Sequence, residues 1–313
     1  MSEELNKYEY VLTTNNLSKF YKGVAACNKV NIHIKEGDIY GFVGENGAGK
    51  TTLIRLINGL SIPSSGSFTL FGIDSNDPNI ISVRKYVGAI VETVSMNKGF
   101  NCLENMQYQN IITDGGKTDK ELIDIMNKCG LKYDEIKSRK VKNFSLGMRQ
   151  RLGIAMALVS NPKLILLDEP MNGLDPEGII EMRDTIIELN KAGVTFFISS
   201  HILAELDKVC NRIGIISHGE MVEEISIDDL HAKSRKQIYL ETPKAEDAER
   251  VLKEKLNLKE IKIFKNEVSI FDDVAIADVM KVLLENNIPV SNFQTKQESI
   301  EDYYIERIRG GIE

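Results

Sequence analysis

One stretch restricts the possible folds of this chain more than any other: YGFVGENGAGKTTLIRLINGL, residues 40–60. A short apolar strand over Ile39–Val43 leads into a loop with the pattern G-x-x-x-x-G-K-[ST], and an amphipathic helix follows. Glycines allow backbone N–H groups to converge on phosphate oxygens, and the N-terminus of the helix adds a favourable dipole. A glycine turn that opens a helix without any ligand is the alternative, but the full pattern between a strand and a helix favours a phosphate loop.

The residue types in this loop suit the binding of a triphosphate. The Lys50 ammonium places a positive charge on the β- and γ-phosphates, and the Thr51 hydroxyl can ligate Mg²⁺. The loop therefore predicts a nucleotide site made by Gly44, Glu45, Asn46, Gly47, Ala48, Gly49, Lys50, Thr51 and Thr52.

Two carboxylates follow a second expected strand. Leu164–Leu167 is a continuous apolar run, which is typical of a strand buried on both faces of a parallel sheet. It ends in Asp168 and Glu169, at the sheet edge where ligands of open α/β folds bind. Adjacent acids repel each other, and Mg²⁺ with a polarised water would compensate them. We therefore expect Asp168 to hold Mg²⁺ and Glu169 to act as general base, with two solvated acids as the alternative.

A third strand, VTFFISSH, ends at His201 on the same predicted sheet edge. A lone histidine is more often a surface residue or a satisfied core residue than a functional one. Its position after a buried strand of this fold nevertheless makes His201 a second catalytic candidate.

Composition sets the outer limits of the interpretation. The 313 residues suffice for one large α/β domain and a smaller one. No run of about 18 apolar residues is present, so we expect no membrane span, and the polar start MSEELNKYEY does not read as a signal peptide. The net charge of −7 argues against broad nucleic-acid binding. Four scattered cysteines form no metal spacing and fit a reducing cytoplasm.

A longer motif is far more specific than the phosphate loop. The block NFSLGMRQRLGIAMALVSNPKLILLDEPMNGLDP resembles the signature-to-D-loop region of ATP-binding-cassette (ABC) ATPases. The usual signature has a second glycine where Leu146 stands, but Ser145 and Gly147, which reach the γ-phosphate in that family, are both kept. The resemblance extends from Val11 to about Glu224.

The same resemblance assigns three further positions. Gly173–Pro176 matches the D-loop, and His201 matches the H-loop of the family. Tyr21 stands where the family stacks an aromatic ring on adenine, although it could equally be an ordinary tyrosine at a strand edge.

The resemblance also implies a fold and a way of working. It implies a P-loop NTPase of the ABC ATPase type, with a parallel core sheet, an N-terminal antiparallel β subdomain and a helical signature subdomain. It implies ATP and Mg²⁺ as ligands and a head-to-tail homodimer in which each signature loop closes on the ATP of the other cassette. Separate permease subunits would hold the protein, otherwise cytoplasmic, on the inner face of the membrane.

Glu92, in KYVGAIVETVS, departs from the usual pattern. Most cassettes have a glutamine there that touches Mg²⁺ and marks the groove where the membrane partner docks. The glutamate resembles a subgroup of bacitracin- and lantibiotic-resistance exporters, and a carboxylate is the stronger Mg²⁺ ligand. We expect Glu92 to be a Mg²⁺ and coupling residue; an uninformative change or a solvated strand end are the alternatives.

The domain organisation follows a change of pattern near residue 233. We expect an ABC ATPase domain over residues 8–232, with its helical subdomain at about 98–160, and a small α+β module over 233–313. The module has the order β-α-β-β-α with one more strand near VSNFQT, which suggests a split βαβ unit. The ending ESIEDYYIERIRGG resembles the terminal helix of export-type cassettes, and we expect a docking or dimer-supporting role for the module.

Three functions are compatible with the phosphate loop. The first is the ATPase subunit of an ABC exporter, and the resemblance of Glu92 points to peptide antibiotics as cargo, with an unrelated cargo left open. The second is a soluble non-transport ABC ATPase, although such proteins usually carry two cassettes or a long coiled-coil insertion. The third, a P-loop kinase or GTPase, does not account for the signature loop.

Overall fold

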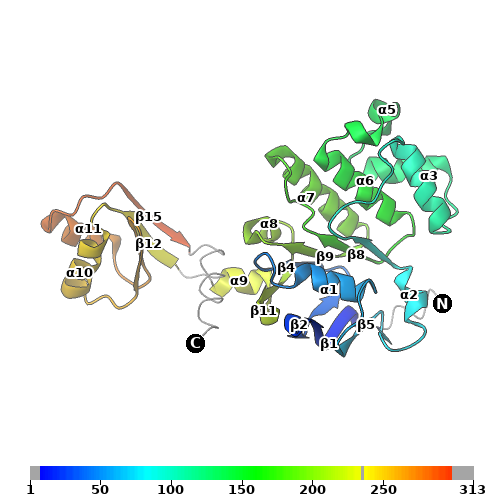
Figure 1. Cartoon of the computed structure of the whole chain (residues 1–313). Coiled ribbons are helices and arrows are strands. Elements are labelled where there is room, and N and C mark those ends of the chain that lie inside the picture. The colour runs from blue at the N-terminus through cyan, green and yellow to red at the C-terminus, as the bar shows by residue number, and fades with distance from the viewer. Residues whose placement is uncertain (1–7, 234–235, 298–313) are drawn as a thin grey trace. The chain divides into compact units, whose positions relative to one another are not determined.

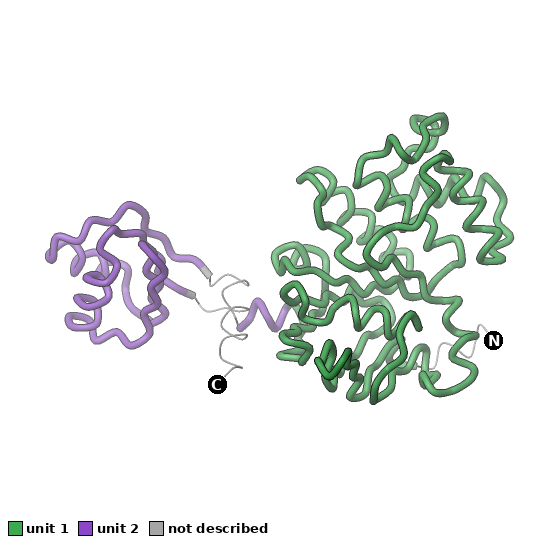
Figure 2. The backbone as a smooth tube through the Cα atoms, in the orientation of Figure 1, with its two compact units in different colours: residues 1–227 green, residues 228–313 purple. Residues whose placement is uncertain are grey.

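The structure, a computed structural model, describes residues 8–233 and 236–297 of the chain. The chain forms two compact units, residues 1–227 and residues 228–313 (Figure 2). The division falls between β11 (Glu220–Ser226) and most of α9 (Ile227–Lys233), slightly before the expected boundary at 232 and 233.

A six-stranded sheet forms the centre of the first unit, in the order β11-β10-β4-β9-β8-β7 (Figure 1). Its five strands other than β11 are parallel, and β11 pairs antiparallel with β10 through a turn at His218 and Gly219. Every residue of β4, β8 and β9 is buried, as expected for parallel strands covered on both faces. The strands are β4 (Ile39–Val43), β7 (Val87–Ile90), β8 (Leu164–Asp168), β9 (Thr195–Ser200) and β10 (Arg212–Ser217).

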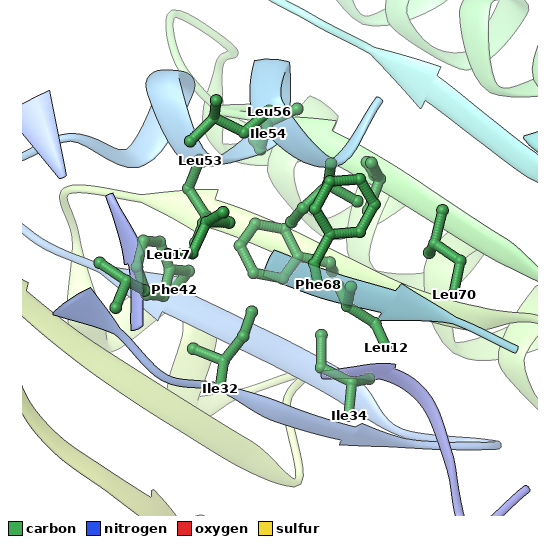
Figure 3. Packing of buried hydrophobic residues seen from close by; sticks show 14 of the residues in the cluster. Leu12, Leu17, Ile32, Ile34, Phe42, Leu53, Ile54, Leu56, Phe68 and Leu70 are labelled. Atoms are coloured by element: carbon green, nitrogen blue, oxygen red, sulfur yellow. The ribbon is translucent and has the colours of Figure 1, made fainter. Parts of the chain in front are cut away.

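An antiparallel sheet from the start of the chain packs against this centre. Its strands are β1 (Tyr10–Tyr21), β2 (Val24–Val30), β3 (His33–Lys35), β5 (Ser65–Leu70) and β6 (Ile73–Asp74), with β1 pairing to β2, β3 and β5. Figure 3 shows Phe68 and Ile32 from this sheet together with Leu53 of helix α1 (Lys50–Ile57) and Phe42 of β4 in one apolar cluster. This cluster fixes the helix that follows the phosphate loop between the two sheets.

The helical subdomain was predicted at about residues 98–160, and the structure has helices there. They are α3 (Cys102–Ile112), α4 (Asp119–Lys128), α5 (Tyr133–Ile136), the 3₁₀ helix η2 (Val141–Asn143) and α6 (Leu146–Leu158). Helix α4 begins with a capping box between Thr118 and Glu121, which satisfies two otherwise unpaired backbone N–H groups. The described part of the unit also contains α2 (Ile80–Arg84), α7 (Pro176–Lys191) and α8 (Leu203–Asp207).

Beyond α9, the described part of the second unit is a single sheet with two helices. Its elements are β12 (Lys236–Glu241), α10 (Ala245–Leu256), β13 (Ile261–Phe264), β14 (Glu267–Ile270), α11 (Ile276–Glu285) and β15 (Asn292–Gln297). The sheet order is β13-β14-β12-β15 with antiparallel neighbours, which is the split βαβ arrangement that the sequence predicted. The predicted terminal helix ESIEDYYIERIRGG, residues 298–311, lies outside the described residues.

None of the helices in the described part of the chain combines the length and the apolar character that crossing a membrane requires. The four cysteines all lie within the described residues, and each is buried and unpaired.

Candidate active site

Three neighbouring parallel strands bring the predicted site residues to one sheet edge. The phosphate loop follows β4, Asp168 ends β8, and His201 follows β9. In the register of the sheet, Val43 is opposite Ser200 and Asp168 is opposite Ser199. Because carboxyl ends of adjacent parallel strands meet, side chains separated by more than a hundred residues become neighbours here.

The phosphate loop requires a glycine directly before helix α1. Gly49 has a φ of 109°, and a Cβ atom at this position would lie 2.1 Å from the Ala26 carbonyl oxygen. Both conditions exclude a larger residue. Among the described residues no side chain caps α1, and its first turn holds no acidic residue. Its first N–H groups and its dipole are therefore available to a phosphate group.

Lys50 is the buried cation of the site. Its ammonium donates to the carbonyl oxygens of Gly44 at 2.7 Å and Glu45 at 3.2 Å, and it lies 3.1 Å from Glu169 Oε1. Its side chain is only 5% exposed. Burying a charge requires such partners, so the loop and the carboxylate together hold the ammonium beside the phosphate cradle.

Asp168 is held from two sides. The Thr51 hydroxyl donates to Asp168 Oδ2 at 2.8 Å, and the Ser199 hydroxyl donates to Oδ1 at 2.7 Å. The hydroxyl and the carboxylate expected to serve Mg²⁺ are thus in direct contact. Hydroxyl and carboxylate oxygens suit Mg²⁺, which usually takes only one or two carboxylates beside phosphate oxygens and water.

Glu169 lies between Lys50 and His201. Its backbone has a φ of 50°, and its N–H group donates to Ser199 Oγ at 3.0 Å. His201 Nδ1 lies 2.7 Å from Glu169 Oε2. Because a carboxylate only accepts, the imidazole donates through Nδ1 and leaves Nε2 to face other groups. The carboxylate is oriented by two partners, as a positioned general base must be.

Two residues of this site were missed by the sequence analysis. Ser199 bonds both to Asp168 and to the Glu169 backbone, and its hydroxyl near the carboxyl end of a buried strand was the available signal. Glu205 on α8 lies near the site: burial raises the pKa of its carboxyl, the charge of His201 lowers it, and the Glu169 carboxylate raises it. Its position in the short helix that begins two residues after His201 was the available signal.

Glu92 is placed differently from the other predicted metal ligands. It lies two residues beyond β7 with a φ of 61°, and its carboxylate pairs with Arg55 at 2.7 Å. Within the described residues no hydrogen bond or ion pair links it to Thr51 or Asp168, and no three acidic, histidine or cysteine side chains cluster as a metal site. Its role at Mg²⁺ therefore stays a prediction.

The remaining loop positions differ in exposure, and Tyr21 is exposed. Glu45, Asn46 and Gly47 are exposed, Thr51 and Thr52 are half-buried, and Gly44 and Ala48 are buried. Tyr21 is 45% exposed, and the Lys19 ammonium lies 5.1 Å from the centre of its ring. An exposed ring is free to stack on a base, but no contact of the described residues tests that assignment.

The signature loop lies elsewhere in the unit. Ser145 caps helix α6, where its hydroxyl accepts from the Met148 N–H group at 3.2 Å. Ser145 and Gly147 line a hollow of about 450 Å³ together with D-loop residues and the start of α7. No residue of the phosphate loop lines this hollow, so within the described part of one chain the two predicted halves of the nucleotide site stay separate.

A phosphate loop, a neighbouring Asp–Glu pair and a signature loop on a helical arm define an ATP-binding cassette. Comparison with known proteins supports this class of protein. A family model described as ABC transporter matches residues 27–172. The bacitracin transport ATP-binding protein BcrA of Enterococcus faecalis is 35% identical over 97% of this chain and 98% of that protein. The lantibiotic transport ATP-binding protein SrtF of Streptococcus pyogenes is 38% identical over 70% of this chain and 92% of that protein. The chain belongs to the ABC transporter family of ATP-binding proteins.

Solved structures agree on the fold. The ATP-binding cassette MJ0796, seen as a dimer bound to ADP and Pi, superimposes with a TM-score of 0.62 at 26% identity, over 69% of this chain and 98% of that one. The cbiO1 protein of Clostridium perfringens, at 24% identity, matches in fold with a TM-score of 0.64 over 80% of this chain and 97% of its own. The predicted family, fold class, ATPase activity and use of ATP with Mg²⁺ are confirmed. Cassettes of this family dimerise, as MJ0796 does, and serve transporters.

Proposed function

We propose that this chain is the ATPase subunit of an exporter that removes peptide antibiotics of the bacitracin or lantibiotic type through a separate membrane permease. The observation that carries the proposal is the length of the match to the bacitracin transport protein. The similarity covers 97% of the chain, so it includes the second unit as well as the ATPase domain that all cassettes share. The glutamate at position 92 agrees with this subgroup.

In the proposed cycle, two copies pair head to tail. Ser145 and Gly147 of one copy close on the nucleotide held by the phosphate loop of the other. This arrangement accounts for the separation of the two half-sites within one chain. ATP then holds the interface together, and its hydrolysis releases it, so that the two states differ in their ligand contacts.

Each residue at the sheet edge has a task in that cycle. Lys50 supplies charge to the β- and γ-phosphates, while Thr51 and Asp168, already in contact at 2.8 Å, hold Mg²⁺, which neutralises the phosphate charge. Glu169 accepts the proton of the attacking water. His201 keeps the Glu169 carboxylate in place through its Nδ1–H group and presents Nε2 to the γ-phosphate side. Tyr21 stacks on the adenine.

A groove beside β7 is the proposed docking site for the permease. It has a volume of about 540 Å³ and is lined by the edge strand β7, the loop after it and the ends of α3 and α6. On α3, Ile111 is 77% exposed and Ile112 is 59% exposed. The groove itself is lined on this helix by Gln109 and by Thr113 at its end. A groove close to exposed apolar residues fits an apolar helix of a membrane partner, and Glu92 lies in the loop segment that borders it.

The test measures antibiotic resistance for the wild-type chain and for a variant designed to bind ATP weakly. The chain is expressed in a sensitive host together with candidate permease subunits, and growth is measured against bacitracin and against a lantibiotic. The wild-type chain should co-purify with the permease and raise resistance. Co-purification without any change in resistance to either peptide would make the cargo wrong, and failure to co-purify with any polytopic protein would favour a non-transport ATPase.

In the same host, Lys50→Ala should abolish the resistance. Loss of a buried charge-assisted contact worth about 1.5–3 kcal/mol should weaken ATP binding by roughly 10- to 100-fold. Calorimetry on the purified chain measures this, and Lys132→Ala, which removes a lysine that is 76% exposed, is the control. Unchanged ATP affinity in Lys50→Ala would mean that the nucleotide binds elsewhere.

A further inference from the structure

The position at which the signature departs from the family pattern makes a contact of its own. Leu146 is the first residue of α6. Its Cδ2 atom would lie 3.3 Å from a Cβ atom placed on Gly173, so the leucine lies directly against this D-loop glycine. Gly173 has a φ of 75°. A side chain at position 173 would therefore be strained by the backbone and crowded by Leu146.

The contact is reciprocal. The D-loop residue Leu174 lies beside Gly147, at 3.6 Å from the position of a Cβ atom there, and also beside Gly178 at the start of α7. Each loop thus presents a leucine to a glycine of the other loop. A glycine in place of Leu146 would remove the first of these two leucine–glycine contacts and leave the first residue of α6 without a side chain.

The D-loop is in turn closely connected to the general base. Only three residues, 170–172, lie between Glu169 and Gly173. Two turns close this segment, because Asn172 N–H donates to the Glu169 carbonyl at 3.1 Å and Leu174 N–H donates to the Met171 carbonyl at 3.3 Å. A displacement of the D-loop therefore reaches the backbone of Glu169 through a short, hydrogen-bonded path.

A second tie joins the same two elements further along. Arg151 of α6 is buried, pairs with Glu181 of α7 at 2.9 Å and donates to the Gly130 carbonyl at 3.0 Å. Helix α6 is thus fixed to α7 by an ion pair in addition to the leucine contact at its N-terminus. The D-loop directly precedes α7, so both ties hold the signature loop to the segment that follows Glu169.

We propose that Leu146 is a positioning residue that locks the signature loop to the D-loop of the same chain. Ser145 closes on the nucleotide held by the partner copy, and Glu169 acts on the nucleotide held by its own chain. Because of the lock, these two residues move together. The inference rests on the proposed head-to-tail pairing of two copies. Its consequence is that closure on the partner's nucleotide and alignment of the chain's own base are coupled through one aliphatic side chain.

The experiment compares three variants of the full-length chain. Leu146→Gly restores the glycine that is usual in the family, Leu146→Met keeps a long apolar side chain, and Ile276→Gly is the matched control. Ile276 is also the first residue of a helix and is 47% exposed, against 37% for Leu146, but it lies in the second unit. ATP turnover is measured against ATP concentration, and ATP affinity and ATP-driven pairing are measured in a Glu169→Gln background.

Leu146→Gly should lower kcat roughly tenfold, because small misplacements of catalytic groups are costly, and should weaken pairing by a similar factor. The affinity of the single chain for ATP should stay within twofold, since Leu146 does not touch the phosphate loop. Leu146→Met should keep most of the wild-type kcat and pairing, and Ile276→Gly should behave as wild type.

Turnover of Leu146→Gly within twofold of wild type would overturn the inference. So would an equal loss in Leu146→Met or in Ile276→Gly, because the effect would then not depend on an apolar side chain at this position. If the Glu169→Gln parent does not pair at all, the proposed pairing fails, and the turnover of the three variants still decides whether Leu146 positions the base.

Discussion

Two glutamates follow neighbouring strands of the same parallel sheet and have the same unusual backbone, yet their surroundings differ. Glu169 comes directly after β8 with a φ of 50°, and Glu92 comes two residues after β7 with a φ of 61°. Glu169 is 20% exposed and is held by Lys50 and His201. Glu92 is 56% exposed and pairs with Arg55, which is itself 42% exposed.

We propose that this difference separates the site of hydrolysis, at Glu169, from the site of coupling to the membrane partner, at Glu92. Strand β8 lies inside the sheet, between β9 and β7, so the groups at its end are surrounded by residues from adjacent strands. Strand β7 is the edge strand, and its end opens onto the groove proposed for the permease. A glutamate with its backbone in the left-handed region is strained in both places. The inner one is held by two partners, Lys50 and His201, whereas the outer one pairs with the half-exposed Arg55. We infer that the inner glutamate acts on water and that the outer one responds to the membrane partner.

Glu169→Gln should give the largest effect. The amide keeps the shape of the side chain but cannot accept the proton of water, so turnover should fall by about 10²- to 10⁴-fold. ATP and Mg²⁺ binding should persist, and an ATP-bound dimer should become visible by size exclusion. Glu92→Gln is the matched control, because it makes the same chemical change at the end of the adjacent strand. Turnover near the wild-type rate in Glu169→Gln would move the base elsewhere, with His201 the next candidate.

The residues that the sequence predicted best are those for which local pattern and topology agree. Lys50 and Thr51 are specified by a loop motif, and Asp168 and Glu169 by a buried strand that must end at the same sheet edge. Parallel pairing then brings them together without further information. The split βαβ order of the second unit was likewise readable, because its strands and amphipathic helices alternate clearly.

Contacts between side chains from distant elements were not predictable. Nothing in the spacing of Arg55 and Glu92 indicates that they pair, and nothing in the signature indicates that Leu146 lies against Gly173. Both depend on how the edge strand and the helical arm pack against the sheet. The structure divides the chain between residues 227 and 228, within a few residues of the boundary expected from the change of pattern near residue 233.

Substitutions of Glu92 test whether the outer glutamate responds to the membrane partner. Glu92→Gln should leave a folded, ATP-binding protein, because an amide serves most of the family and an exposed ion pair contributes at most about 1 kcal/mol. Transport per ATP should fall by up to about fivefold, more than basal ATPase does. Glu92→Ala should lower both, since no oxygen remains to reach Mg²⁺. ATPase and transport are measured in one reconstituted system with the permease.

Arg55→Gln refines that series because it frees the Glu92 carboxylate without altering it. A change in coupling that matches Glu92→Gln would assign the effect to the ion pair, and wild-type coupling would assign it to the carboxylate. If wild type, Glu92→Gln and Glu92→Ala all behave alike, Glu92 is only the solvated end of a strand, and it no longer supports a peptide antibiotic as cargo.

The smallest expected effect concerns Glu205. Its carboxyl interacts with His201 and Glu169, so it reports on the charges around the inner glutamate. Burial raises the pKa of the Glu205 carboxyl above its ordinary value of 4.5, the charge of His201 lowers it and that of Glu169 raises it. Below pH 4.5 this carboxyl is protonated in both the folded and the unfolded chain. Above pH 4.5 the unfolded chain loses the proton first, so the folded chain binds more protons and its stability falls as pH rises through the folded pKa.

Glu205→Gln lacks this titration. Its free energy of unfolding relative to wild type should therefore increase from pH 4.5 towards neutrality, by less than about 1 kcal/mol for a partly exposed group. Denaturant unfolding at several pH values measures the difference. The increase should be smaller in a Glu169→Gln background, where one of the charges that raise the pKa is gone. An increase of the same size in both backgrounds would mean that Glu205 does not respond to the Glu169 carboxylate.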